Sequence, residues 1–263
     1  MKYKYIDEGK QHLHTLDEKP LIGTSSVSNV LAKPLTWWAS GLAVAKFGWI
    51  NKKDENGKYR TKEERLAVAS NRFSEIKELD SEEYLDLVDS AYSAHAEKLD
   101  SSASAGTDLH AEIERYIKWV MGGSKGDSIF DTRIEPFIIW ANKNVKRFLW
   151  SEIHCFSKEL WVGGISDFGY EDMEGKYVVG DIKSSKEAYL SQFWQCAGYA
   201  IQLEENGGFD RDGNKILTLD KPIEYFMIFP FGMKEPEAQI NLDNQGGRDA
   251  FKAELFLYKK LNS

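Results

Sequence analysis

The stretch GDIKSSKEAYLSQFWQCAGYA, residues 180–200, decides the fold because it joins a buried strand to an amphipathic helix. Ile182 and the two valines before residue 180 predict the strand, yet Asp181 and Lys183 interrupt its apolar pattern. Strand residues two apart face the same way, so these two charges share one face. Burying a carboxylate and an ammonium is costly unless something pairs them. The question is therefore which groups contact the charged side chains of Asp181 and Lys183.

The preceding run, GGISDFGYED, predicts a partner strand that turns back through Met173–Gly175. In that hairpin Asp167 lies roughly opposite Asp181, and like charges ~5 Å apart on paired strands are destabilising. A divalent cation reverses the sign, because hard metal ions prefer convergent carboxylates. The hairpin thus indicates a metal site with Lys183 beside it. A buried salt bridge, or an edge strand with solvated charges, remains the alternative.

The rest of the chain predicts helices around a sheet. The first half reads mainly as helices, with a charged loop at 51–60 and further helices beginning near Thr107 and ending near Trp150. After residue 150 come three strand-like runs, a helix at 186–205, the strand IEYFMIFPF and a C-terminal helix from about Arg248. This order predicts an α/β fold with a mixed sheet. We expect residues 1–103 to form a helical N-terminal region packed on a core of residues 104–263.

Composition bounds the class of protein. The 263 residues, 42% hydrophobic and 29% charged, are typical of a soluble globular protein, without an apolar run that could span a membrane or serve as a secretory signal. The net charge of −8 argues against a protein that grips nucleic acid over its whole surface. Two cysteines cannot form a four-cysteine iron–sulfur cluster.

Three further features accompany the charged hairpin. His110 and Glu114 are four residues apart in a predicted helix, and so are Gln195 and Tyr199 in the helix after the hairpin, so each pair shares a helix face. Glu152 opens the strand before the hairpin. Each feature taken alone has a simpler explanation, respectively an inert surface histidine, an amphipathic core helix and a solvated strand end.

Together and in this order, the histidine helix, GGISDF, GDIK and QCAGY resemble the PD-(D/E)xK nuclease superfamily, in its RecB-like branch. That branch includes the RecB nuclease domain, the mitochondrial genome maintenance exonuclease and many phage exonucleases. The resemblance covers residues 104–205, and the first half resembles phage-type members only loosely. It implies a restriction-endonuclease-like core, a central mixed sheet flanked by helices.

The resemblance also implies roles for individual residues. His110, Asp167, Asp181 and the backbone carbonyl of Ile182 match the metal ligands, and Lys183 matches the motif lysine. The motif on the following helix is matched by Gln195 and Tyr199, and we expect Glu114 to hold His110 or to serve a second ion. The implied cofactor is Mg²⁺ or Mn²⁺, one or two ions, without the iron–sulfur cluster of some members.

The predicted function is metal-dependent hydrolysis of DNA phosphodiesters by an exonuclease, in phage recombination, repair or processing of DNA. Two alternatives stay open: a structure-selective endonuclease with the same site, and a non-catalytic module that binds DNA ends. An unrelated α/β protein with a structural ion pair is a third.

Contacts to DNA must come from local positive charge. The candidates are Ser184, Ser185 and Lys186 just after the motif, and Lys52, Lys53 and Arg60 in the charged loop. An ordinary solvated loop is the alternative for the loop residues. Trp37, Trp38 and Trp49 can stack on unpaired bases, with core packing as the alternative. Expected partners are duplex ends or single strands of DNA and a single-strand annealing protein, in the cytoplasm of a bacterial host.

Overall fold

The computed structural model describes residues 2–8, 11–31, 36–54, 56–125 and 129–263. The chain forms two compact units, one of residues 1–32 and 106–263 and the other of residues 33–105. Helix α4 (Ser81–Met121) begins in the second unit and ends in the first. Among the described helices, none combines the length and hydropathy of a membrane-spanning segment.

The first unit is built on an eight-stranded mixed sheet with the order β11-β10-β7-β6-β5-β8-β9, and β4 pairs with β6 outside this path. Its strands are β4 (Ile22–Gly23), β5 (Val145–Ser157), β6 (Val162–Asp172), β7 (Tyr177–Lys183), β8 (Gly208–Phe209), β9 (Lys215–Leu217), β10 (Ile223–Pro230) and β11 (Gln239–Asn241). β5, β6 and β7 form an antiparallel meander, whereas β10 runs parallel to β7. A parallel neighbour requires a crossover, and helix α6 (Leu190–Asn206) supplies it.

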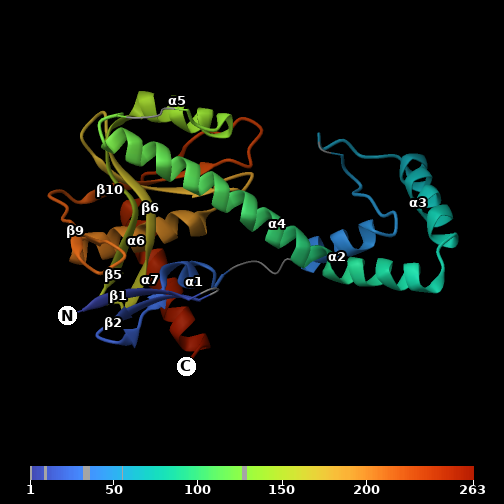
Figure 1. Ribbon diagram of the computed structural model, residues 1–263, viewed down its shortest axis with the longest axis horizontal. Helices are drawn as coiled ribbons and strands as arrows, with labels where there is room; N and C mark the ends of the chain where they lie inside the picture. Colours follow the sequence, from blue (N-terminus) through green and yellow to red (C-terminus); the bar gives the residue numbers. More distant parts are fainter. Residues whose placement is uncertain (1, 9–10, 32–35, 55, 126–128) are drawn as a thin grey trace. The chain divides into compact units, whose positions relative to one another are not determined.

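Helices cover both faces of this sheet (Figure 1), and the side chains of β7 belong to the cores on both faces. Val178 and Ile182 belong to a core cluster with the end of α4, the 3₁₀ turn Thr132–Ile134 and α5 (Glu135–Asn144). Tyr177 and Val179 belong to a second cluster with α6. Helix α7 (Asn244–Leu261) and the short α1 (Thr24–Ser28) pack against α6. The alternation predicted for β7 is therefore observed, and the predicted α/β class with a mixed sheet between helices is confirmed.

Two glycines let aromatic rings lie across the meander. A Cβ on Gly180 would come within 2.3 Å of the Phe168 ring, and a Cβ on Gly169 within 2.1 Å of the Trp150 ring. Contacts this short do not occur between real atoms, so these positions need glycine for close approach. The GD pair of β7 thus combines a packing residue, Gly180, with a functional candidate, Asp181.

The first 23 residues differ from the helical region we predicted. They form the strands β1 (Tyr3–Glu8), β2 (Gln11–Leu16) and β3 (Lys19–Pro20), which make a small antiparallel sheet, and then β4. Tyr3, Leu16 and Leu21 pack with Phe156 of β5, so residues 1–32 belong to the core unit and not to a separate N-terminal region. These strands were missed because they are short and rich in polar and charged residues.

Two helix boundaries also differ. Residues 81–121 form one helix, α4, where a new helix was expected near Thr107, because the Ser, Ala and Gly residues before Thr107 do not end it. A single Gly in a helix interior costs only about 1 kcal/mol. Helix α5 ends at Asn144, not near Trp150, and Val145 already begins β5, where β-branched and aromatic side chains alternate with charged ones.

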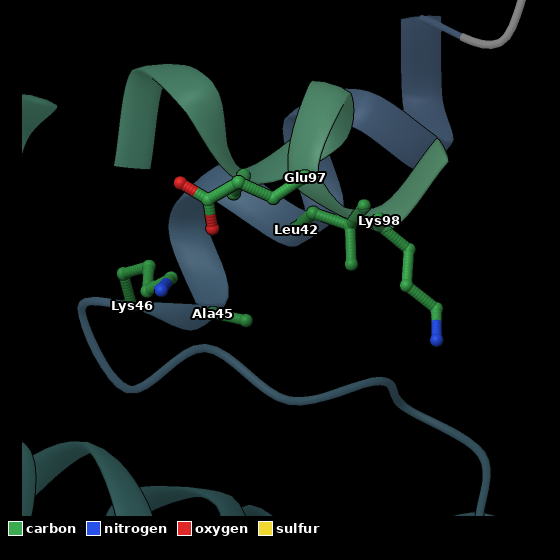
Figure 2. Close-up of a pocket in the computed structure, with 6 residues that line it drawn as sticks. Leu42, Ala45, Lys46, Glu97 and Lys98 are labelled. Atoms are coloured by element: carbon green, nitrogen blue, oxygen red, sulfur yellow. The ribbon is translucent and has the colours of Figure 1, made fainter. Parts of the chain in front are cut away.

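The second unit contains α2 (Thr36–Ala45), α3 (Lys62–Lys77) and the first part of α4. A capping box between Thr61 and Glu64 begins α3, but this described helix has no buried residue. A cavity of about 500 Å³ lies between the end of α2, with Leu42, Ala45 and the following Lys46, and α4, which contributes Ala94, Glu97 and Lys98 (Figure 2). The second unit therefore has little core of its own.

Candidate metal centre and active site

Three carboxylates lie side by side across the meander. Glu152 and Asp167 lie between the paired residues Ser151–Phe168 and Ile153–Ser166 of β5 and β6, and Asp167 and Asp181 directly follow the last β6–β7 pair, Phe168–Gly180. The backbone N–H of Ile182 donates a hydrogen bond of 2.9 Å to Oδ2 of Asp167, which ties β6 to β7 at this row. The predicted opposition of Asp167 and Asp181 is thus present, and Glu152 extends it to a third strand.

A histidine on α4 completes a group of potential metal ligands. Nδ1 of His110 lies 3.5 Å from Oδ2 of Asp167. His110, Glu152 and Asp167 each offer one ligand atom, and these three atoms lie within 4.8 Å of one another. All three side chains are half-buried. The Asp181 carboxylate is not part of this group, although it is the next in the row.

Glu152 carries two marks of an unusual environment. Its backbone has φ of 49°, the left-handed region that non-glycine residues seldom adopt and that often marks functional sites. Burial, together with the nearby carboxylates of Asp167 and Glu114, raises the pKa of Glu152 to about 8. A carboxyl that resists ionisation beside other carboxylates is one that a cation would stabilise in its charged form.

Asp181 and Lys183 form a buried ion pair on β7. Oδ2 of Asp181 lies 2.7 Å from Nζ of Lys183, and the aspartate side chain is only 2% exposed. Burial and the neighbouring Asp167 raise the pKa of Asp181, although Lys183 acts in the opposite direction. Burial lowers the pKa of Lys183, but the two aspartates outweigh it and raise that pKa overall. Lys183 is therefore a cation at neutral pH.

The Oδ2 atom of Asp181 is short of partners. Apart from its ionic contact with Lys183, it accepts no well-aligned hydrogen bond from the described residues. A buried carboxylate oxygen without a full set of donors is costly and calls for an explanation. A buried carboxylate oxygen whose close partner is one ammonium, next to a His, Glu and Asp group, fits a site that accepts an additional cation.

Lys183 is held by the helix that follows the motif. Its Nζ donates a hydrogen bond of 3.4 Å to Oε1 of Gln195, and Nε2 of Gln195 donates one of 2.8 Å to the hydroxyl of Tyr199. Tyr199 is buried among the residues between α6 and the sheet. The predicted helix motif is thus in contact with the predicted lysine, and its geometry suits positioning of Lys183.

Glu114 lies outside the group of three candidate ligands, and the N–H and side chain of Ile182 have other partners. Glu114 pairs with Lys118 one turn along α4, and its charge reaches Glu152. Ile182 contributes its N–H to Asp167, and its side chain is buried in the core. The Glu114 carboxylate therefore acts on Glu152 electrostatically, although Glu114 is not one of the three candidate ligands.

Ser184, Ser185 and Lys186 follow the motif at the end of β7. Ser184 and Lys186 are exposed, whereas the hydroxyl of Ser185 donates to the carbonyl of Glu187 and accepts from Gln192. The backbone carbonyl of Ser185 also accepts from the N–H of Gly232. Ser184 and Lys186 are thus accessible to a ligand, while Ser185 holds the turn.

Lys52, Lys53 and Arg60 belong to the second unit. Lys52 and Lys53 are exposed, and the ammonium of Lys53 lies 4.9 Å from the centre of the Tyr59 ring. The guanidinium of Arg60 donates to the backbone carbonyls of Asn51 and Lys53. Arg60 therefore closes the loop, whereas the two lysines remain available at its surface.

The donor set fits a hard or borderline divalent cation. Carboxylate oxygens suit Mg²⁺ and Mn²⁺, and an imidazole ligand favours Mn²⁺ over Mg²⁺. His110, Glu152 and Asp167 would hold such an ion, with Asp181 next in the row. Comparison with protein-family models gives no match to this sequence, and no curated protein matches it either.

Proposed function

We propose that this protein is a metal-dependent nuclease that hydrolyses phosphodiester bonds in DNA. The observation that carries the proposal is the row of carboxylates Glu152, Asp167 and Asp181, with His110 beside Asp167 and the half-buried cation Lys183 paired with Asp181. A structural ion pair would need only Asp181 and Lys183. It would not account for a half-buried histidine and two further carboxylates at the same place.

The chain's own residues have distinct tasks in this proposal. His110, Glu152 and Asp167 would hold a Mg²⁺ or Mn²⁺ ion, which when bound would polarise a phosphate oxygen and lower the pKa of a water molecule. Lys183 stays charged and stabilises the negative charge that develops on the phosphate. Asp181 holds the ammonium in place from one side.

Gln195 and Tyr199 act on the phosphate only through Lys183. The chain of contacts from Tyr199 through Gln195 to Lys183 fixes the ammonium in one position. A fixed charge needs no reorganisation during the reaction, which is how preorganised groups lower a barrier. We therefore assign both residues as positioning residues and not as acids or bases.

The resemblance of the motifs to RecB-like nucleases favours an exonuclease, with a role in phage DNA recombination, repair or processing. A structure-selective endonuclease would use the same site. End-labelled linear duplex, single-stranded and closed circular DNA, each with Mg²⁺, Mn²⁺ or EDTA, separate the two. Metal-dependent loss of linear substrates alone supports the exonuclease, and nicking of the circle supports the endonuclease.

Lys183→Ala and Asp181→Asn provide the control for that assay. Both variants should lose cleavage of every substrate while keeping the circular dichroism spectrum of the wild type. Cleavage by the wild type that survives EDTA, or full activity in either variant, would contradict the proposed function.

A further inference from the structure

The second unit exposes aromatic side chains that soluble proteins usually bury. Trp37 is 90% exposed and Tyr59 is 68% exposed, and Trp38 and Trp49 are 38% and 39% exposed. Tryptophan carries a large apolar surface, so a nearly free indole on a helix costs solvation free energy. Exposed apolar groups that gather in one place mark a binding surface.

Two contacts within the second unit relate these residues to one another and to neighbouring lysines. Trp37 and Gly41 are one turn apart on α2, and the Trp49 ring lies against Gly41, at 3.6 Å from where its Cβ would be. The Trp49 ring therefore sits next to the face that carries Trp37. Lys52 and Lys53 follow three and four residues later, and a β-bridge joins Lys53 to Tyr59.

We define the aromatic–lysine surface as Trp37, Trp38, Trp49, Lys52, Lys53 and Tyr59.

Positively and negatively charged residues are unevenly distributed along the sequence of the second unit. Residues 41–74 carry eight Lys or Arg and four Asp or Glu, whereas residues 75–100 carry two Lys or Arg and nine Asp or Glu. In a chain of net charge −8, this positive segment contains Trp49 and Tyr59 and begins three residues after Trp38. Two of its three arginines, Arg60 and Arg72, donate to backbone carbonyls and are thus engaged in the fold. The exposed side chains of Lys52 and Lys53 remain available to contact a ligand.

We propose that the aromatic–lysine surface binds single-stranded nucleic acid. Unpaired bases present faces on which Trp and Tyr rings stack, and the lysines meet the phosphates between them. A duplex hides its base faces, so the exposed rings would contribute little to binding it. The inference deepens the proposed function, because it assigns the strand form that the nuclease receives, but binding itself requires neither the metal centre nor cleavage.

The test is fluorescence anisotropy with the full-length protein in EDTA, so that no probe is cut. The probes are fluorescein-labelled oligothymidylate, oligouridylate of the same length and a blunt hairpin duplex. The variants are Trp37→Ala, Tyr59→Ala and the pair Lys52→Ser and Lys53→Ser. Tyr92→Ala is the matched control, because Tyr92 is 84% exposed but lies in the acidic segment.

We expect Trp37→Ala and Tyr59→Ala each to weaken oligothymidylate binding about tenfold. The double lysine variant should flatten the dependence of log K on log salt concentration by roughly 1.4, about 0.7 for each phosphate that a lysine no longer neutralises. Tyr92→Ala should bind as the wild type does, and the hairpin should bind more weakly than the single strands. Equal effects with oligouridylate would extend the site to RNA.

Unchanged binding in Trp37→Ala and Tyr59→Ala, or equal losses in Tyr92→Ala, would overturn the inference. So would self-association in sedimentation velocity that Trp37→Ala abolishes without an effect on oligonucleotide binding, since the surface would then cover a second copy. The two proposals are tested separately, because binding is measured in EDTA and cleavage is measured with added metal. Binding without any wild-type cleavage refutes only the nuclease, and cleavage without these binding losses refutes only the surface.

Discussion

Nζ of Lys183 lies 2.7 Å from Oδ2 of Asp181 and 3.4 Å from Oε1 of Gln195, so one ammonium joins the carboxylate row of the sheet to helix α6. This relationship separates two roles of Lys183. The ammonium neutralises a buried carboxylate, which concerns stability, and it places a positive charge beside the ligand group, which concerns catalysis.

Lys183→Ala should affect both roles, and a second substitution should separate them. Without the ammonium, Asp181 is buried unpaired or becomes protonated, so the free energy of unfolding should fall by about 1–3 kcal/mol. Lys183→Ala combined with Asp181→Asn should recover much of that loss in urea denaturation, yet cleavage should stay below detection. Recovery of cleavage in the double variant would contradict the role of Lys183.

Tyr199→Phe tests the positioning chain with a near-isosteric change. It removes the hydroxyl that accepts from Gln195, and we expect stability to fall by about 1 kcal/mol and cleavage by roughly tenfold. Substrate binding should be unaffected if the residue acts only through Lys183. A variant with unchanged single-turnover cleavage would show that the Gln195–Tyr199 contact is structural only.

Gly180→Ala tests the packing that holds the motif strand. The new Cβ would meet the Phe168 ring at 2.3 Å, so the ring or the strand must shift, and we expect a loss of about 1–3 kcal/mol in the free energy of unfolding. Gly41→Ala is the control, because its Cβ meets only ordinary contacts at 3.6 Å within helix α2. Equal stability of Gly180→Ala and wild type would contradict the close packing of β6 on β7.

Glu254 on α7 predicts a dependence of stability on pH that is independent of the metal centre. Its side chain is 1% exposed, neither carboxylate oxygen has a hydrogen-bond partner among the described residues, and burial raises its pKa to about 7. The folded protein therefore holds a proton that the unfolded chain loses above about pH 4.3. Stability should fall as pH rises from about 4.5 to 7, by an amount on the order of 1–3 kcal/mol.

Glu254→Gln is neutral at every pH, so it should flatten that part of the stability curve in urea denaturation at a series of pH values. Glu224→Gln, at an exposed position on β10, is the matched control and should keep the wild-type slope. If Glu254→Gln also keeps the slope, Glu254 is not buried as a neutral acid.

The part of the site that sequence predicts is the part encoded locally. Asp181, Lys183, Gln195 and Tyr199 lie on one strand and the helix directly after it, so strand alternation and helix spacing were enough to bring them together. The hairpin was equally local, since its short turn sets the register of Asp167 against Asp181.

The residue that sequence undervalued is Glu152. Its position depends on the register of β5 against β6 and on a backbone with positive φ, and neither follows from a run of residues that reads as an ordinary strand start. The end of α5 was misplaced in the same region. The one signal in the sequence for Glu152 was an acidic residue in the strand that precedes the charged hairpin. Sequence patterns also did not predict the N-terminal strands. β4 pairs with β6, which is distant in sequence, and β1 and β2 carry many polar and charged residues.

The central claim is that the carboxylate row holds a metal ion that cleavage requires. The most direct measurement counts bound Mn²⁺ by electron paramagnetic resonance, and the cleavage rate of linear DNA on the same samples, for wild type, Asp167→Asn and Glu152→Gln. Glu171→Gln, at a buried carboxylate paired with Lys146 and Arg147 away from the row, is the control. We predict that the wild type and Glu171→Gln bind Mn²⁺ and cleave DNA, and that the other two variants lose both. Wild-type Mn²⁺ binding and cleavage in Asp167→Asn and Glu152→Gln would contradict the account.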